Sequence, residues 1–424
     1  MSFDLSTTYE RALLRPLDLP STDTNATNEP ANLSEESQWR ASTHIFRGTG
    51  DRDETVAWPP AKLNDDPSNI PNDETYNIPY SPASKKANDS NFKLYSDLEQ
   101  RKASNVLPPK LVAKRYIPTT QVNKSEQGVT LLTLTGMGVP KEMYEPMLEA
   151  LLPRLRRSGV QVEEIWAIDM PLSGQTAKAN PVGYLYANEK DIVRDLLLFL
   201  TAYLPVQPGV ELPKHLKPRT PTGQAQQPTR QNLHVFAHSL GAQAAILASV
   251  HAPNIFSSLM VVDPAMIPAG KINDAMTKLP KEIFCLGLEE HFPDRNAVKT
   301  ALRENKRTQN WDERAIEAFT QHGVVPSEKG GVKLNWALWY DKQTPAECYD
   351  RFKDISVPLL VIMPKRPFAV PAKMFEADVG ELKGRVDIRW VEGTHQVVYE
   401  RMDDCVGFVG EWLGDIAGEK RAKL

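Results

Sequence analysis

The chain is poor in cysteine, and this scarcity excludes a fold that depends on disulfide bonds. Only Cys285, Cys348 and Cys405 occur in 424 residues, and they lie far apart in the sequence. An odd number at such spacing fits neither a disulfide framework nor a zinc site. We therefore expect a reducing, intracellular environment and a fold that depends on its hydrophobic core.

The sequence also lacks a membrane span, a secretory signal and an excess of positive charge. No apolar run approaches the length of about 20 residues that a transmembrane helix needs. The residues Met1–Ser6 carry neither the basic start nor the apolar core of a secretory signal. The formal net charge is −4, which provides no basic surface for nucleic acid. We expect no membrane span and no nucleic-acid partner.

Periodic apolar patterning is missing from the first quarter of the chain. Residues 1–105 are rich in Asn, Ser, Asp, Thr and Pro, and prolines spaced among polar residues block both helix and central strand. We interpret this part as an N-terminal extension that is partly disordered or wraps the surface, and we expect regular structure to begin near Pro109. The candidates for local docking on the core are Phe46, Trp58 and Tyr76.

After the extension, β-rich apolar runs alternate with helical patterns, which predicts an α/β fold with a doubly wound, mostly parallel sheet. The predicted strands, besides the one before Ser239, are Lys110–Ile117, Gly128–Thr135, Val162–Asp169, Ser257–Asp263, Val357–Met363 and Gly384–Val391. The core is assigned to residues 106–265 and 352–418. Residues 266–351, with helical segments and scattered aromatic residues, are predicted to form a helical cap over the carboxyl ends of the strands.

The stretch Leu233–Ser249 has the order of a nucleophile elbow, which is a strand, a tight turn and a helix. Its serine, Ser239, stands at the turn. The residues two before and two after it must be small to avoid collision in so sharp a turn, and they are Ala237 and Gly241. The alternative interpretation is a buried serine in an ordinary strand-to-helix turn.

A glycine-bracketed loop, Gly136–Pro140, follows the predicted strand Gly128–Thr135. In hydrolases of this layout such a loop supplies half of an oxyanion hole, and the residue after the nucleophile supplies the other half. The candidate donors are therefore the backbone N–H groups of Met137 and Leu240.

The base and the acid are expected in the chain order nucleophile, acid, histidine. Among the eight histidines, His395 alone follows the final predicted strand, so it is the candidate base. The common position of the acid, after the next-to-last strand, is occupied by Pro367. Asp263 ends an earlier strand and is the preferred acid. The alternatives are Glu376, Asp378 and Glu392.

The last residues resemble a targeting signal. Ala422–Leu424 is a close variant of the Ser-Lys-Leu peroxisomal signal, and two basic residues precede it. We assign residues 419–424 to a targeting tail for a peroxisomal import receptor and expect the Gly-Glu-Lys-Arg lead-in to be poor in helix. The predicted location is the peroxisomal matrix, with the cytoplasm as the alternative.

The segment Gly138–Pro146 resembles the Gly-Phe-Pro-Lys-Glu-Leu-Tyr-Glu-Pro segment of fungal peroxisomal α/β-hydrolases, which include lipase-like enzymes and hydrolases of toxin biosynthesis. The elbow, the histidine loop and the terminal Ala-Lys-Leu fit the same group, and the resemblance covers about residues 105–265 and 352–424. The chain departs from the group's pattern at Thr135, Ala237 and Pro367.

The resemblance implies an α/β-hydrolase that cleaves a carboxylic ester or thioester of a hydrophobic acyl group through an acyl-Ser239 intermediate, with no metal or organic cofactor. One alternative is an acyltransferase or thioesterase in a peroxisomal secondary-metabolite pathway. Another, from a different class, is a catalytically silent binding protein. Both enzyme alternatives predict labelling by a reagent that reacts with active serines, whereas the silent binding protein predicts none.

Overall fold

A computed structural model of the chain describes the following residues. They are residues 26–31, 33, 38–49, 110–119, 128–170, 173–179, 189–219, 229–268, 288–289, 291–327, 329–335, 345–367, 370, 372–380, 382 and 384–422.

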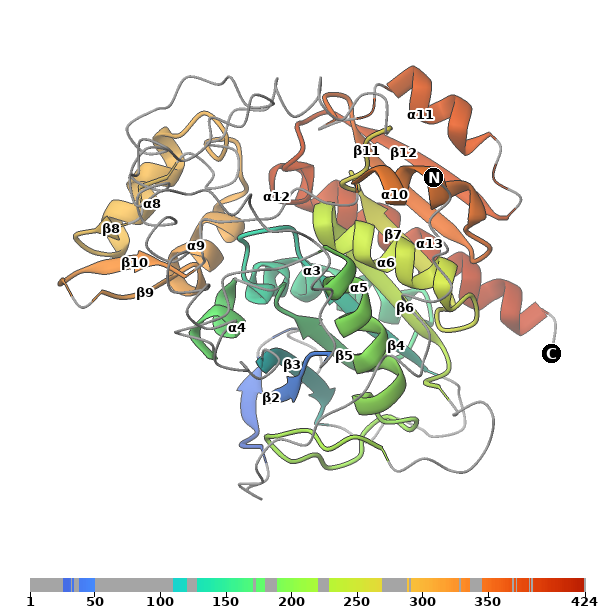
Figure 1. The fold of residues 1–424 in the computed structure, drawn as a ribbon, viewed down its shortest axis with the longest axis horizontal. Helices are drawn as coiled ribbons and strands as arrows, with labels where there is room; N and C mark the ends of the chain where they lie inside the picture. Colours follow the sequence, from blue (N-terminus) through green and yellow to red (C-terminus); the bar gives the residue numbers. More distant parts are fainter. Residues whose placement is uncertain are drawn as a thin grey trace, which may run out of the picture.

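The centre of the fold is a nine-stranded sheet with the strand order β1-β2-β3-β5-β4-β6-β7-β11-β12 (Figure 1). The strands are β1 (Glu29–Ala31), β2 (Trp39–Arg47), β3 (Lys110–Pro118), β4 (Val129–Leu134), β5 (Val162–Ile168), β6 (Leu233–His238), β7 (Ser258–Val262), β11 (Leu359–Pro364) and β12 (Val386–Val391). Six neighbouring strands of this order, β5, β4, β6, β7, β11 and β12, run parallel. The first three are added antiparallel at one edge. The prediction of an α/β fold with a mostly parallel sheet is confirmed.

Helices cover both faces of this sheet. On one face α3 (Glu145–Arg157) packs against α13 (Met402–Ala422), and on the other α5 (Glu189–Leu198) packs against α6 (Ser239–His251) (Figure 1). Neighbouring strand residues belong to opposite cores, since Phe236 joins the α3 and α13 side and Val235 the α5 and α6 side. Burial on both faces explains why β4, β6, β7 and β11 are apolar runs without alternation.

The shorter helical elements connect these layers. They are η3 (Lys141–Tyr144), α4 (Gly174–Ala179), η4 (Phe199–Tyr203), α10 (Pro345–Arg351), η7 (Phe352–Asp354), α11 (Ala372–Val379) and α12 (Val397–Glu400). Among them, η3 follows the loop after β4, and α12 follows the loop after β12. Both loops carry predicted site residues, so these two short helices determine where those loops are held.

Part of the predicted N-terminal extension belongs to the central sheet. β2 pairs with β3 along its whole length, from Trp39 opposite Pro118 to Arg47 opposite Lys110. The prediction that regular structure begins near Pro109 is therefore wrong. Trp39 and Phe46 are buried in opposite cores, so β2 is held by tertiary packing that polar flanking composition does not reveal. Trp58 and Tyr76 lie outside the described residues.

The region predicted as a helical cap contains a small sheet as well as helices. Its described elements are α8 (Arg295–Glu304), α9 (Glu313–His322), and the antiparallel strands β8 (His291–Phe292), β10 (Val332–Leu334) and β9 (Val324–Pro326). Val298, Trp311 and Phe319 are buried in the same core as α3 and α13. This region is thus packed against the helices of the central sheet through shared apolar contacts.

The last described element is a long helix, although we expected the residues before the predicted targeting signal to be poor in helix. α13 continues through Ala422, so the residues before the predicted signal are helical instead of poor in helix. Arg385 anchors this helix, because its guanidinium lies over the Trp412 ring at 4.6 Å and pairs with Glu419. Within the described ranges, no helix is both long and apolar enough to cross a membrane.

Candidate active site

The turn between β6 and α6 holds Ser239 in a strained backbone conformation. Its φ is +54°, in the left-handed region that side-chain-bearing residues rarely occupy. A Cβ on Gly241 would lie 2.5 Å from the carbonyl oxygens of Leu134 and Thr135. The first turn of α6 therefore lies directly against the end of β4, and only glycine permits this approach. Ala237, fully buried in β6, shows that a methyl group is accommodated on the other side of the serine.

The loop after β4 contacts this elbow. A Cβ on Gly136 would lie 3.3 Å from Ser239 Cβ and 3.0 Å from His238 Nδ1, so the loop backbone runs close beside the serine. The predicted oxyanion donors, Met137 and Leu240, consequently belong to two segments that meet at Ser239. The loop is bound at its far end as well, because Thr135 Oγ1 donates to a carbonyl four residues later at 2.9 Å.

Ser239, His395 and Asp263 are joined by hydrogen bonds. His395 Nδ1 lies 2.7 Å from Asp263 Oδ2, and His395 Nε2 lies 2.8 Å from Ser239 Oγ. A carboxylate only accepts, so Nδ1 carries the proton of the neutral ring and Nε2 accepts from the serine hydroxyl. The Asp263 side chain is 2% exposed and that of His395 15%, so the carboxylate is shielded while the imidazole is reachable.

The turn that carries Asp263 is strained in the same way as the elbow. Its φ is +33°, and within the described ranges the left-handed residues with a side chain are Asn232, Ser239 and Asp263. The Asp263 N–H donates to Ile362 O at 3.0 Å, and the Ala265 N–H donates to Ser239 O at 3.1 Å. These bonds fix the turn to β11 and to the elbow. They thereby hold the Asp263 carboxylate in one direction despite the backbone strain.

The alternative acids lie in different surroundings. Glu376 is exposed on α11. Glu392 is exposed and pairs with Lys365, which holds the pKa of this carboxyl below its usual range. The side chain of Asp378 lies outside the described residues. After β11, where Pro367 replaces the common aspartate, the chain carries the cations Lys365 and Arg366 instead of a carboxylate.

The loop that presents His395 is held on both sides. Thr394 donates through its backbone N–H and its hydroxyl to the two carboxylate oxygens of Glu400, at 2.7 and 2.6 Å. His238 Nε2 donates to the His395 carbonyl oxygen at 2.7 Å. The expected chain order excludes His238 as the base, and no motif in the sequence marks Glu400. The sequence offers one signal for the role of His238, which is its position directly before Ser239 in the elbow.

A second unpredicted feature is a buried ion cluster beside η3. Lys141 Nζ lies 2.9 Å from Asp169 Oδ2 and 3.0 Å from Glu142 Oε1, and all three side chains are almost fully buried. Burial opposes the positive charge, but the two carboxylates raise the pKa of Lys141 above its usual range. The Lys141 N–H also donates to Asp169 Oδ1 at 2.9 Å. The cluster ties η3, and with it the loop that contains Met137, to the end of β5.

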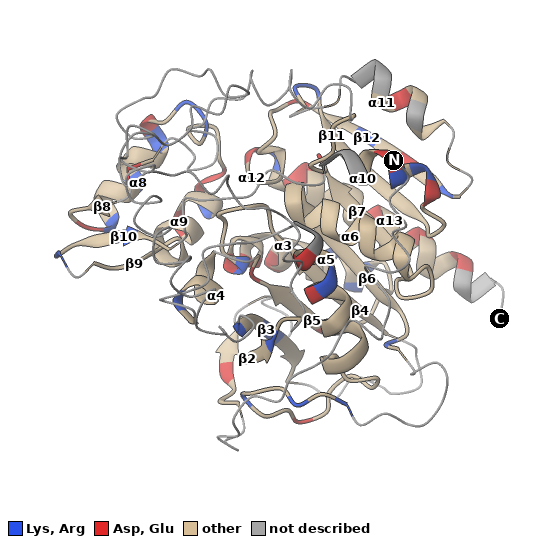
Figure 2. Cartoon of the chain, in the orientation of Figure 1, with Lys and Arg blue, Asp and Glu red and all other residues tan. Residues whose placement is uncertain are grey.

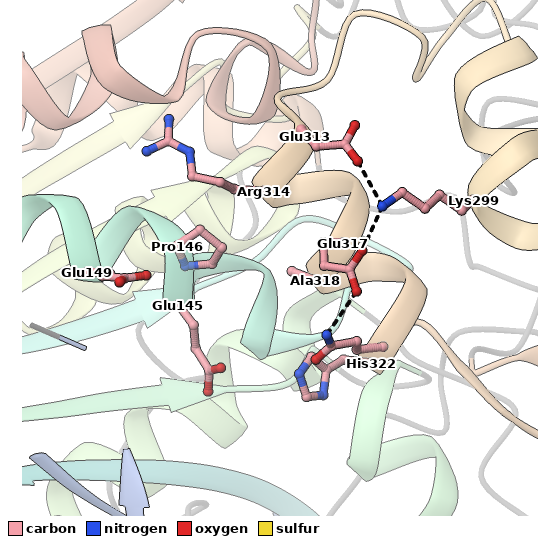
Figure 3. A pocket seen from close by; sticks show the side chains of 10 residues that line it. Glu145, Pro146, Glu149, Lys299, Glu313, Arg314, Glu317, Ala318 and His322 are labelled. Atoms are coloured by element: carbon pink, nitrogen blue, oxygen red, sulfur yellow. Dashed lines mark hydrogen bonds and ion pairs between the residues drawn. The ribbon is translucent and has the colours of Figure 1, made fainter. Parts of the chain in front are cut away.

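A groove of about 420 Å³ lies between α3, α8 and α9, and its lining includes none of the three bonded side chains (Figure 3). Lys299, at its edge, pairs with Glu313 and Glu317 at 2.8 Å each. Acidic and basic residues are interspersed in this way over the described helices (Figure 2). The lining has four glutamates, one lysine and one arginine but no serine, threonine or cysteine, so the candidate active site remains at Ser239.

The known proteins that resemble this chain include fungal thioesterases and a yeast hydrolase. The type I acyl-CoA thioesterases mpaH' of Penicillium brevicompactum and mpaH of Penicillium roqueforti are 26% and 25% identical to it over 217 residues, which is 50% of this chain. The match spans only 44% of the length of these relatives. The solved structure of the peroxisomal alpha-beta-hydrolase Lpx1 from Saccharomyces cerevisiae has a TM-score of 0.58 at 15% identity, with 89% of each chain covered.

The family model described as the alpha/beta hydrolase family matches residues 131–408, which is well over half of the chain. The matched region begins in β4 and ends in α13, so it contains the elbow, the Asp263 turn and the His395 loop. The chain belongs to the alpha/beta hydrolase family.

Proposed function

We propose that this protein is a serine hydrolase that cleaves a carboxylic ester or thioester through an acyl-Ser239 intermediate. The observation that carries the proposal is the chain of hydrogen bonds from Ser239 through His395 to Asp263. The three side chains come from segments that follow β6, β12 and β7, so the fold assembles them from distant parts of the sequence. A nucleophile bonded to a base that is oriented by a third group is the arrangement that acyl transfer requires.

In the proposed reaction His395 Nε2 removes the Ser239 proton while Oγ attacks the carbonyl carbon of the substrate. Asp263 stabilises the imidazolium that forms, and the N–H groups of Leu240 and Met137 donate to the developing oxyanion. His395 then protonates the leaving alcohol or thiol. Water, activated by the same nitrogen, attacks the acyl-serine and releases the carboxylic acid. No metal or organic cofactor enters this scheme.

The acyl group is proposed to be hydrophobic, and a thioester is the form that the relatives favour. The supporting observation is the acyl-CoA thioesterase activity in the names of the fungal relatives. Transfer of the acyl group to an acceptor other than water is the alternative with the same residues. Comparing acyl-CoA thioesters with p-nitrophenyl esters, with free acid measured as product, distinguishes these reactions.

The proposed location is the peroxisomal matrix, with import through Ala422–Leu424. The terminal tripeptide and the peroxisomal hydrolase among the similar structures support this proposal. α13 ends at the periphery of the molecule, away from the cap (Figure 1). Expression in fungal cells with and without the last three residues tests it, since loss of the tripeptide is expected to leave the protein in the cytoplasm.

Labelling with a fluorophosphonate probe tests the serine hydrolase itself. The wild type is expected to be labelled, and Ser239→Ala is expected to lose the label while its thermal unfolding stays close to that of the wild type. Equal labelling of Ser239→Ala, or no labelling of a folded wild type, contradicts the proposal. The second result, with retained binding of acyl compounds, favours the catalytically silent binding protein.

A further inference from the structure

His238 stands immediately before the proposed nucleophile, yet its side chain reaches the backbone of the proposed base. Its Nε2 lies 2.7 Å from the His395 carbonyl oxygen, and the two ring centroids are 4.8 Å apart. A carbonyl oxygen only accepts, so the proton of the His238 ring must be on Nε2. The elbow therefore contributes both the hydroxyl that meets the His395 ring and the donor that holds the His395 backbone.

We propose that His238 is a positioning residue, whose Nε2–H holds the His395 carbonyl so that the His395 ring stays in line with Ser239 Oγ. The inference rests on the proposed function, because it assigns His238 a role in activating that serine. The bond matters because the carbonyl and the ring belong to the same residue. With Thr394 already fixed by Glu400, anchoring the carbonyl restrains the backbone on both sides of the His395 Cα.

The surroundings of His238 keep its ring neutral and in place. The side chain is completely buried, and burial, followed by the nearby His395, holds the pKa of His238 well below its usual range. Its Nδ1 has no hydrogen-bond partner among the described residues and faces Gly136, where a Cβ would lie 3.0 Å away. A neutral neighbour is favourable, because His395 becomes positively charged during the proposed reaction and a second cation would repel it.

Aromatic packing fixes the other side of the ring. The Tyr399 ring meets His238 edge-on with centroids 5.8 Å apart, and Trp311 of the cap lies 5.0 Å from Tyr399. The Asp312 N–H donates to Tyr399 O at 2.8 Å. The His238 ring is therefore confined between the glycine loop and α12, so its donor has one direction in which to act.

Two polar substitutions of His238 separate positioning from packing. The amide nitrogen of Gln reaches the place of a histidine Nε2, whereas that of Asn reaches only the place of Nδ1. We expect His238→Gln to label with the fluorophosphonate probe within about fivefold of the wild-type rate, because a donor to the His395 carbonyl is retained. His238→Asn and His238→Phe are expected to be at least about tenfold slower than His238→Gln, with kcat for p-nitrophenyl butyrate lowered more than KM changes.

His234 supplies the matched control, because it is buried in the same strand and bonds Ser258 Oγ at 2.8 Å. His234→Asn and His234→Gln are expected to change thermal unfolding without separating in labelling rate. Equal rates for His238→Gln and His238→Asn overturn the proposal, and so does an unchanged rate for a folded His238→Phe.

A measurement that needs no turnover separates this proposal from the function on which it rests. The His395 Nδ1 proton, in the bond to Asp263, should give a strongly downfield proton resonance. We expect that resonance to persist in His238→Gln and to broaden or disappear in His238→Asn. If the wild type shows the resonance but is not labelled, the proposed function fails while positioning by His238 is still decided by this comparison. If the resonance is identical in both variants, positioning fails and the proposed function stands.

Discussion

Two buried polar clusters at opposite ends of the central sheet differ in how completely their groups are paired. At the carboxyl end, Ser239, His395 and Asp263 form a chain that stops at the serine hydroxyl. At the amino end, Glu164 lies between Arg115 and Arg230 and pairs with both. In this second group, named the arginine–glutamate cluster, all three side chains are almost fully buried.

The arginine–glutamate cluster is closed by further bonds to the backbone. Arg115 donates to Val210 O at 2.7 Å, and Arg230 donates to Pro205 O at 2.8 Å and to Gln207 O at 3.0 Å. Burial opposes ionisation of Glu164, but the two guanidinium groups lower the pKa of this carboxyl below its usual range. These bonds hold the segment Pro205–Val210, which lies between η4 and β6, on the sheet. At Ser239, by contrast, the hydroxyl has an acceptor for its proton in His395 Nε2, as the proposed reaction requires.

The largest expected effect is on rate at the open end. Asp263→Asn should lower the fluorophosphonate labelling rate and ester turnover by about ten-thousand-fold, because an amide does not stabilise the imidazolium or enforce the required tautomer. Thermal unfolding should change little in comparison. Glu376→Gln is the matched control, because Glu376 is exposed on α11, and it should leave both rates unchanged. Retained turnover in Asp263→Asn would reject this acid.

At the arginine–glutamate cluster we expect the opposite, a large loss of stability with little change in labelling rate. Glu164→Gln leaves two buried guanidinium groups without their carboxylate, which should cost about 3–5 kcal/mol of the free energy of unfolding in urea titrations. The labelling rate per folded molecule should stay at the wild-type value. Glu392→Gln, which breaks the exposed pair with Lys365, should leave the free energy of unfolding close to the wild-type value. Similar losses in both variants would mean that burial does not distinguish the two pairs.

The histidine next to this cluster predicts a pH dependence of stability. Burial lowers the pKa of His44 to about 4. Between this value and the unfolded pKa of about 6.5 the unfolded chain binds more protons, so stability rises with pH across this window. Two and a half pKa units correspond to roughly 3 kcal/mol lost between pH 7 and pH 4.

His44→Asn removes this titration and keeps a donor, because His44 Nδ1 donates to Pro213 O at 2.9 Å. The amide nitrogen of Asn occupies the same place as that nitrogen. Urea titrations at pH 7, 5.5 and 4 should therefore show a loss that is smaller by roughly 3 kcal/mol in the variant than in the wild type. Parallel losses in the two proteins would show that His44 is not the responsible group.

The smallest expected effect tests one bond of the closed cluster. Thr130 Oγ1 accepts from Arg230 at 2.9 Å at the start of β4. Thr130→Val removes this acceptor from a buried guanidinium and should cost about 1–2 kcal/mol in urea titrations. Labelling of Ser239 should be unaffected, because the change lies at the opposite end of the neighbouring strand. A slower labelling rate would show that the two ends are coupled.

Local order in the chain was sufficient to predict the parallel strands and the elbow. Runs such as Val129–Leu134 are apolar because both faces are covered, and a small residue is required beside a serine in a sharp turn. The position of His395 after the last strand followed from the chain order of the fold. The identification of Asp263 used the same order together with the absence of an acid at Pro367, and its catalytic role remains a prediction.

Other features depend on residues that are distant in sequence and have no local signature. β2 is polar in its flanks, and only pairing with β3 and burial of Trp39 and Phe46 make it a strand. The arginine–glutamate cluster joins residues from β3, β5 and the segment before β6, and no motif links them. The contact of His238 with the His395 backbone crosses 157 positions.

By itself, the sequence determined an α/β fold, an elbow at Ser239 and a histidine in the last loop, because strand burial and turn sterics act over a few neighbouring residues. The tertiary structure decided between Asp263 and the other carboxylates as the partner of His395, and it alone revealed the contacts that hold this histidine and the arginine–glutamate cluster. These outcomes depend on distances between segments that only the packed sheet brings together.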